Sequence, residues 1–219
     1  MYLPKISTIV TMRIDALKPS EHKRGRILLT LENGTVLRIT EEEVLRFRLQ
    51  VGQLLDDETL TAIQQSAKTS STKVRAVHMI ANRPLSKCEL QKRLVQKGSD
   101  TEDAEAAVSW LEGMGVMDDV AYATTLVRHY STRGYGVARI REELYRRGVP
   151  RELWDEALNQ LPDSSETLDT LDTLIQKKKR GDLADPKERK RICDALLRRG
   201  FSWSEVKTAL ERYTEIPEE

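Results

Sequence analysis

The stretch Leu90-Gln-Lys-Arg-Leu94-Val-Gln-Lys-Gly98 recurs twice in this sequence, as Ile140-Arg-Glu-Glu-Leu144-Tyr-Arg-Arg-Gly148 and as Ile192-Cys-Asp-Ala-Leu196-Leu-Arg-Arg-Gly200. In each copy, two apolar residues four positions apart share one face of a helix, and a glycine follows where the helix is expected to end. The glycines are 50 and 52 residues apart, from 148 − 98 and 200 − 148. Three copies with a period near 50 residues predict an array of repeated structural units.

Each repeat is expected to hold three helices, since the similarity extends past the glycines into a following apolar pair, Ala107-Val108, Ala157-Leu158 or Ala209-Leu210. Capping boxes at Ser86-x-x-Glu89 and Ser202-x-x-Glu205 mark two of the helix starts. The first helices are predicted at 73–82, 119–132 and 166–179. The second helices are predicted at 87–97, 137–147 and 187–199, and the third at 101–113, 151–160 and 203–213.

The first 40 residues instead predict β-structure. Apolar residues alternate loosely from Ile6 to Leu17, and Asn33-Gly34 separates two β-rich runs, Ile27–Leu31 and Val36–Thr40. An Asn-Gly pair favours a type I′ hairpin turn, in which both central residues have positive φ. Thr40 and Glu43 then form a capping box that starts a short helix ending near Phe47. Residues Leu54–Lys68 continue with the apolar spacing of a helix.

The polar stretch Ser66–Thr72 is interpreted as a linker between this region and the repeats. We therefore predict a mainly α-helical protein in which three tandem three-helix repeats form an elongated, curved array, preceded by a small domain containing a β-hairpin. The predicted domains are 1–68 for the hairpin and short helices, 69–116, 117–163 and 164–219 for the three repeats, the last including an acidic tail.

The composition excludes several classes of protein. The 219 residues hold 36 Lys and Arg against 35 Asp and Glu, a net charge of +1, and only 5% are aromatic. No apolar run approaches the roughly 18 residues of a membrane span, and the N-terminus does not resemble a secretory signal. The two cysteines, Cys88 and Cys193, suggest reduced thiols, so a cytoplasmic protein is expected. We also expect a monomer without membrane contact.

Catalytic and cofactor signals are weak throughout the sequence. The three histidines lie on different predicted elements, without ligands at metal-site spacing, and no phosphate-binding glycine loop is present. The carboxylate pair Asp118-Asp119 is better explained as an N-cap of the helix that follows. We therefore expect no enzyme activity, no bound metal and no cofactor.

The near-zero net charge conceals strong local excesses. Residues 100–119 hold seven acidic side chains and no basic one, 128–151 hold seven arginines against two glutamates, and 177–199 hold ten basic against four acidic residues. Ion pairs four residues apart, Arg139–Glu143, Glu142–Arg146 and Glu143–Arg147, would explain part of this charge as a solvated helix face. The remaining arginines, interleaved with tyrosines, favour binding to a phosphate backbone or an acidic protein surface.

The three tryptophans, Trp110, Trp154 and Trp203, stand at different distances from their glycines. A base-stacking ring repeated in each unit is therefore not indicated, and we predict that each tryptophan packs in the core of a third helix.

Three sets of segments follow one another in a recognisable order: Asn82-Arg-Pro-Leu-Ser86 with Glu89-Leu90 and Lys97-Gly98, Asp118-Asp119 with Arg133-Gly-Tyr-Gly136 and Gly148, and Leu197-Arg-Arg-Gly200-Phe201-Ser202. In order and content, these segments resemble the RecX family, cytoplasmic bacterial regulators of the RecA recombinase, over residues 73–213. The N-terminal segment Pro4–Val10 with the hairpin resembles, more loosely, the β-containing extension of Firmicute-type members. Ser99 departs from the apolar residue that members usually carry there, so different packing or capping of the helix at 101–113 is expected.

The resemblance implies a non-enzymatic modulator that lies in the groove of a RecA–single-stranded-DNA filament and inhibits strand exchange or alters filament dynamics. Its implied partners are the RecA nucleoprotein filament and the backbone of single- or double-stranded DNA. The candidate contact residues are Arg128, Arg133, Tyr135, Arg139, Arg146, Arg147, Lys190, Arg191, Arg198 and Arg199. The alternative is a direct DNA-binding protein with tandem helix-turn-helix-like units, in which the helix at 137–147 would enter a major groove.

Overall fold

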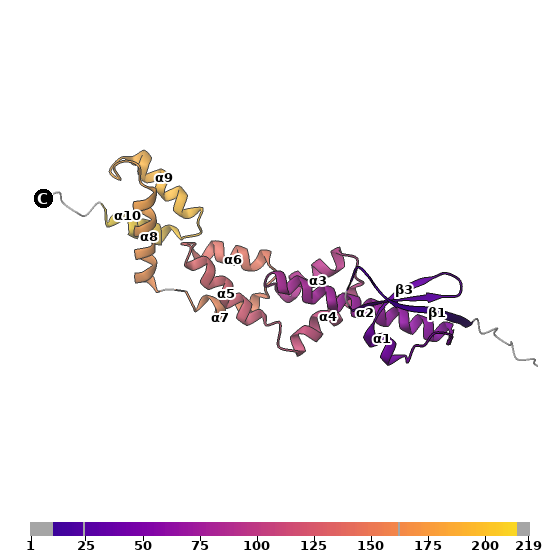
Figure 1. Cartoon of the computed structure of the whole chain (residues 1–219). Helices are drawn as coiled ribbons and strands as arrows, with labels where there is room; N and C mark the ends of the chain where they lie inside the picture. Colours follow the sequence, from indigo (N-terminus) through magenta and orange to yellow (C-terminus); the bar gives the residue numbers. More distant parts are fainter. Residues whose placement is uncertain (1–10, 24, 162, 214–219) are drawn as a thin grey trace, which may run out of the picture. The chain divides into compact units, whose positions relative to one another are not determined.

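The computed structural model of the chain describes residues 11–23, 25–161 and 163–213, which form helices and one antiparallel sheet (Figure 1). They divide into two compact units. The first combines the chain up to Arg83 with Gln91–Leu111, and the second combines Pro84–Leu90 with the chain from Glu112 onward. The predicted alternation over residues 6–10, the segment Pro4–Val10 and the acidic tail at 214–219 lie outside the described residues.

A four-stranded antiparallel sheet begins the first unit, in the strand order β3-β2-β1-β4. Its strands are β1 (Thr11–Pro19), β2 (Arg26–Leu31), β3 (Val36–Thr40) and β4 (Leu54–Asp56). Alternation places Ile14, Leu29, Ile39 and Leu55 on the buried face, where they pack with Ile63 of the following helix. The predicted β-structure is confirmed, but Leu54–Asp56, expected to be helical, forms the edge strand.

The hairpin between β2 and β3 is confirmed, whereas its predicted turn type is wrong. Among the described residues other than glycine, only Arg48 has a positive φ, so Asn33 does not adopt the type I′ conformation. Gly34 alone takes the left-handed conformation, with φ of 81°. The Gly34 N–H donates to the Leu31 carbonyl at 2.8 Å, and Asn33 Oδ1 accepts from the Thr35 N–H at 2.9 Å. The loop between β2 and β3 is therefore longer than a two-residue type I′ turn, and Gly34 occupies its left-handed position.

The capping box at Thr40 and Glu43 is confirmed and starts α1 (Glu41–Arg46). The linker predicted at Ser66–Thr72 is wrong, because α2 (Asp57–Asn82) runs through it without a break. Its hydroxyls have internal partners. Ser66 and Ser70, one turn apart, donate to the buried carboxylate of Glu43 at 3.0 and 2.5 Å. Thr69 donates to Asp103 at 2.5 Å. Buried carboxylates require hydrogen-bond donors, so these polar residues belong inside a packed helix.

The remaining helices follow the predicted repeat closely. They are α3 (Lys87–Gln96), α4 (Thr101–Gly113), α5 (Asp119–Ser131), α6 (Val137–Arg146), the 3-10 turn η1 (Arg151–Leu153), α7 (Trp154–Leu158), α8 (Ser164–Lys178), α9 (Pro186–Leu197) and α10 (Trp203–Glu211). The first helix of the first repeat is the last part of α2, and the third helix of the second repeat is divided into η1 and α7. No helix in the described ranges is both long and apolar enough to cross a membrane.

The pattern of two apolar residues four positions apart, followed by a glycine, has the predicted structural role in all three repeats. The apolar pairs of α3, α6 and α9 are fully buried, and each closing glycine has a positive φ, of 86°, 66° and 87° in turn. In the third repeat, α8, α9 and α10 enclose one core that includes Leu171, Ile192 and Val206 (Figure 1). The repeat is therefore both a sequence pattern and a packing pattern.

The predicted core position of the tryptophans is only partly correct. Trp110 and Trp154 are partly buried, and Trp154 Nε1 donates to the Val149 carbonyl at 3.0 Å. For Trp203 the prediction is wrong, because this residue is 62% exposed at the start of α10. The core of the third repeat is filled instead by the aliphatic residues Val206 and Leu210, which follow on the inner side of the helix.

The second and third repeats meet where the end of α9 contacts the start of α6. The Gly136 N–H donates to the Arg199 carbonyl at 2.9 Å, and the Ala138 N–H donates to the Gly200 carbonyl at 3.1 Å. Backbone groups that lack partners within each helix thereby satisfy one another. Two glycines permit this approach, since a Cβ atom at Gly136 would lie 2.3 Å from the Gly200 carbonyl oxygen.

The first and second repeats meet in an equivalent way. The end of α6 contacts the start of α3, where the Ser86 hydroxyl donates to the Arg147 carbonyl and accepts from the Glu89 N–H at 3.1 Å. A Cβ atom at Gly148 would lie 2.9 Å from Cys88 Sγ. Counted from the closing glycines, Ser86 and Gly136 hold the same repeat position. At both junctions, the C-terminal end of the second helix of one repeat contacts the N-terminal start of the second helix of the preceding repeat.

We expect Gly136→Ala to destabilise the protein by about 2 kcal/mol, because the added methyl group overlaps backbone that cannot move independently of α9. Gly136 has an ordinary φ of −80°, so the loss would come from packing and not from backbone strain. Urea unfolding followed by circular dichroism measures it. Gly113→Ala is the matched control, as no atom lies within 4 Å of its added Cβ. Equal stability of the two variants would contradict the role of this junction.

Candidate functional site

All ten candidate contact residues lie in the second unit. Arg128 is on α5, Arg133 and Tyr135 are in the loop that follows, and Arg139 and Arg146 are on α6, with Arg147 as its C-cap. Lys190 and Arg191 are on α9, and Arg198 and Arg199 follow its last turn. The structure separates these residues into a group bound to other parts of the protein and a group that faces solvent.

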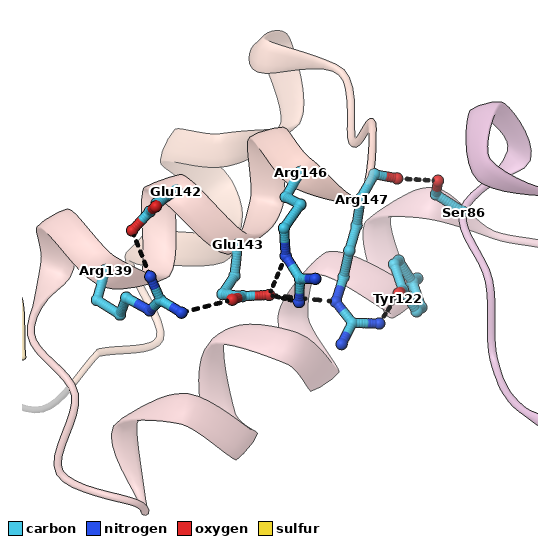
Figure 2. A network of polar contacts seen from close by, with 7 residues as sticks. All are labelled: Ser86, Tyr122, Arg139, Glu142, Glu143, Arg146 and Arg147. Carbon is cyan, nitrogen blue, oxygen red and sulfur yellow. Dashed lines mark hydrogen bonds and ion pairs between the residues drawn. The ribbon is translucent and has the colours of Figure 1, made fainter.

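Glu143 is the centre of the bound group (Figure 2). Its carboxylate is only 2% exposed and accepts from Arg139 Nη2 at 3.1 Å and from Arg146 Nη2 at 2.6 Å. Arg147 Nε lies 3.6 Å from the same carboxylate. One buried negative charge therefore orients three of the predicted contact arginines.

Two of the three predicted ion pairs on α6 are confirmed, those of Glu143 with Arg139 and with Arg147. The third is wrong, because Arg146 turns to Glu143 and Glu142 pairs with Arg139 at 2.6 Å. The interpretation of this helix as a solvated face missed the burial of Glu143. Its position three residues after the buried Ile140 was the available sign, because residues three apart share a helix face.

The pKa of Glu143 lies below its ordinary value. Burial disfavours the carboxylate, but the hydrogen bonds from Arg146 and Tyr130 and the charges of Arg146 and Arg139 favour it and outweigh burial. Glu143 is therefore ionised in the folded protein at neutral pH, and the arginine arrangement persists there.

Arg147 joins this network to the preceding repeat (Figure 2). Its Nη1 donates to the Tyr122 hydroxyl of α5 at 3.0 Å, while its carbonyl accepts from Ser86. The side chain is 22% exposed, so most of it is occupied by structure. Arg147 is consequently a weaker contact candidate than the sequence indicated.

Arg199 has a similar position at the next junction. Its Nη1 donates to the carbonyls of Arg133 and Gly134 at 3.0 and 2.9 Å, and its guanidinium lies over the ring of Tyr135, 5.0 Å from the ring centroid. The structure thus brings Arg133, Tyr135 and Arg199 together. Arg191 is also bound internally, to Glu188 at 2.6 Å and to the Lys178 carbonyl at 2.6 Å.

The solvent-facing group consists of Arg128, Arg133, Lys190 and Arg198. Each is exposed, and within the described parts of the chain none of these side chains has a hydrogen bond or an ion pair. Arg141, which was not among the candidates, is exposed and unpaired in the same sense. These cations can contact an external anion without breaking an internal bond.

The acidic pair Asp118-Asp119 has the predicted capping role. Asp118 Oδ1 accepts from the N–H groups of Val120 and Ala121 at 2.8 and 3.2 Å, at the start of α5. Asp119 is 4% exposed and accepts from the Lys87 N–H at 2.9 Å, at the start of α3. Among the described residues, no group of three or more potential ligands could hold a metal ion.

Comparison with known proteins places these helices in one family. Family models described as "RecX, second three-helix domain" and "RecX, third three-helix domain" match residues 118–158 and 165–210. "Regulatory protein RecX" of Vibrio parahaemolyticus is 31% identical over 148 residues, which are 67% of this chain and 94% of the relative. The chain belongs to the RecX family. "Regulatory protein RecX" of Xanthomonas campestris pv. campestris (strain B100) is 33% identical over 135 residues, 62% of this chain and 83% of the relative.

Solved RecX structures share the fold. "Crystal structure of regulatory protein RecX" superposes with a TM-score of 0.70 at 23% identity, covering 91% of this chain and 99% of that one. "Crystal structure of RecX from Lactobacillus salivarius" gives 0.60 at 19% identity, covering 68% and 98%. All ten candidate residues fall within the two matched RecX domains.

The unusual Ser99 of this RecX protein is accommodated by polar neighbours. The equivalent Val149 and Phe201 are 4% and 6% exposed and pack in the cores of the second and third repeats. Ser99 Oγ instead accepts from Arg75 at 2.8 Å and bonds with the Thr72 hydroxyl at 3.1 Å. The predicted difference at this position is therefore a hydrogen-bonded cluster in place of an apolar contact.

We expect Glu143→Gln to lower the free energy of unfolding by about 2 kcal/mol at pH 7, because charge-assisted hydrogen bonds to a buried carboxylate are lost. Since the folded pKa is depressed, this stabilisation is present above the unfolded pKa of about 4.3 and is lost as pH falls through the folded pKa. Urea unfolding at pH 7 and at lower pH should show the difference between wild type and variant shrinking in acid.

Glu142→Gln is the control for this prediction. Its side chain is 63% exposed on the same helix and pairs only at the surface with Arg139, so a much smaller loss is expected. Equal losses for the two variants would contradict the central role of Glu143.

Proposed function

We propose that this protein is a non-enzymatic inhibitor of RecA that binds in the groove of the RecA–single-stranded-DNA filament. The observation that carries the proposal is a set of exposed cations, Arg128, Arg133 and Arg198, whose side chains have no hydrogen bond or ion pair among the described residues and which lie in the matched RecX domains. Membership of a family of regulatory proteins supports regulation over catalysis. The RecA filament, with its DNA, is the partner that the family resemblance implies.

The bound arginines fit a supporting role in this proposal. Arg139 and Arg146 are held by Glu143, yet their side chains remain 38% and 65% exposed. A guanidinium that is held in place loses less conformational freedom when it contacts a phosphate or a carboxylate. The free cations supply the attraction, and the bound ones supply fixed positions.

Direct, sequence-specific DNA binding remains the second candidate because the three-helix repeats are similar to tandem helix-turn-helix units. The arginines of α6 and its C-cap argue against this alternative. Arg139 and Arg146 donate hydrogen bonds to Glu143, and Arg147 donates to the Tyr122 hydroxyl. Reading base edges needs side chains that can extend from the helix into the major groove. The arrangement favours contact with a charged backbone or protein surface.

Reversing three free cations tests the proposed surface. Arg128→Glu/Arg133→Glu/Arg198→Glu should raise the concentration needed for half-inhibition of RecA strand exchange by about tenfold or more, because attraction becomes repulsion. Lys18→Glu/Lys23→Glu/Lys92→Glu is the control, since it makes the same change in net charge at exposed sites elsewhere. Undiminished inhibition by the first triple variant, once circular dichroism shows that it is folded, would contradict the assignment of these three residues to the contact surface.

Binding to DNA without RecA separates the two candidate functions. We expect DNA binding that does not depend on sequence and that weakens steeply with salt. For each phosphate contacted, the logarithm of the affinity should fall by about 0.7 to 0.9 per tenfold increase in salt concentration. Fluorescence anisotropy with labelled single-stranded and duplex oligonucleotides at several salt concentrations measures this. Retention of one duplex sequence over others at ~150 mM salt would support the helix-turn-helix alternative.

A further inference from the structure

A groove of about 520 Å³ lies between α9 and α10 in the third repeat. On α10 it is lined by Trp203, Val206, Lys207, Leu210 and Glu211, which are separated by three, one, three and one positions. This spacing forms one continuous stripe along the helix. The groove therefore follows α10 over its full length, from its first residue to its last.

The α9 wall shows the same continuity. Arg189, Lys190, Cys193 and Leu197 line the groove and also fall on one stripe. Cys193 is 8% exposed and forms part of the floor, while Leu197 is 37% exposed at the end of the wall. Two adjacent helices thus frame a channel between their long faces, the geometry in which proteins bind an amphipathic helix.

The centre of the groove is apolar and open to solvent. Trp203, 62% exposed, lines the groove together with Leu197, and the buried Val206 and Leu210 form its floor. An exposed tryptophan next to aliphatic side chains is typical of the residues that dominate the binding energy of protein interfaces. Folding of the third repeat does not use this ring, since the core is complete without it.

Basic side chains gather at one end of the groove. Arg189 and Lys190 lie in the first half of α9, and within the described residues neither side chain has a hydrogen bond or an ion pair. Lys207 lies 3.6 Å from Glu211, and Asp194 is the other acidic residue of the lining. An occupant with carboxylates at one end and apolar side chains along its middle would complement this distribution.

The equivalent face is closed in the first repeat. There Gln91 and Glu105 hold the repeat positions of Cys193 and Lys207, and Gln91 Nε2 donates to Glu105 Oε1 across the two helices at 2.9 Å. Thr101 holds the position of Trp203. The exposed apolar channel of the third repeat is therefore not a necessary consequence of the repeated fold.

We propose that the groove between α9 and α10 binds an acidic amphipathic helix of a partner protein. The apolar face of that helix packs on Trp203, Leu197 and the floor, and its carboxylates pair with Arg189 and Lys190. Nine residues of α10 span about 13 Å, which matches two to three turns of a bound helix. The apolar surface made by Trp203, Leu197 and the aliphatic floor disfavours a nucleic-acid backbone, because sugars and phosphates would leave this surface poorly covered. Lys190, first grouped with the filament contacts, belongs to this groove.

The test uses the full chain and a fluorescein-labelled helical peptide of about twelve residues, with leucines along one face and glutamates on the others. Fluorescence anisotropy should show saturable binding, and a peptide of the same composition in shuffled order should bind at least about tenfold more weakly. Trp203→Ala should weaken binding by about tenfold or more. Tyr145→Ala is the matched control, because this aromatic is 67% exposed at the position equivalent to Leu197 in the second repeat. It should leave the affinity unchanged.

The double variant Arg189→Glu/Lys190→Glu tests the role of charge. It should weaken binding of the acidic peptide and leave the affinity for a peptide with glutamines in place of the glutamates unchanged. Leu197→Gln, at the exposed rim, gives a second apolar variant should Trp203→Ala fold poorly. Three results would each overturn the proposal: equal binding of the shuffled peptide, unchanged affinity of both apolar variants, or displacement of the peptide by oligothymidine. Concentration-dependent dimerisation that Trp203→Ala abolishes would assign the groove to a second copy of this chain instead.

Discussion

The close approach of backbone at Gly136 and Gly200 is the constraint on which the second unit depends. At this point the last carbonyls of α9 accept hydrogen bonds from the first N–H groups of α6, and no side chain at either glycine would fit between them. The end of α6 meets the start of α3 at the equivalent position, where the Ser86 hydroxyl donates to the Arg147 carbonyl. The join between the second and third repeats is therefore built from backbone, and the join between the first and second uses one side-chain hydroxyl.

These junctions also divide the arginines into two kinds. Arg147 and Arg199 adjoin the closing glycines and contribute carbonyls to the joins, while their side chains are held by Tyr122 or by the carbonyls near Gly134. Glu143 collects Arg139 and Arg146 on the same face. Cations that look alike in the sequence therefore differ in their contacts. The bound ones are held by internal partners, whereas Arg128, Arg133 and Arg198 are exposed and make no side-chain hydrogen bond or ion pair within the described residues.

Errors in the sequence analysis share one physical origin, which is that polarity does not reveal burial. Ser66, Ser70 and Thr69 looked like linker residues, but they supply donors to the buried carboxylates of Glu43 and Asp103. Glu143 looked like one member of a surface ion-pair ladder and is instead buried. Trp203 shows the reverse case, a large apolar residue at the surface. For the hydroxyls, the deciding neighbours are carboxylates from distant parts of the chain.

The sequence alone determined the three repeats, the buried apolar pairs, the left-handed glycines, the hairpin and the family, because all of these depend on local periodicity and backbone preference. Tertiary structure alone decided that Ser66–Thr72 is helical, that Gly136 is needed for contact with Gly200, which arginines have internal partners, and that α9 and α10 enclose an open apolar groove. Those features depend on which atoms from distant segments meet, and a linear pattern of residue types does not specify that.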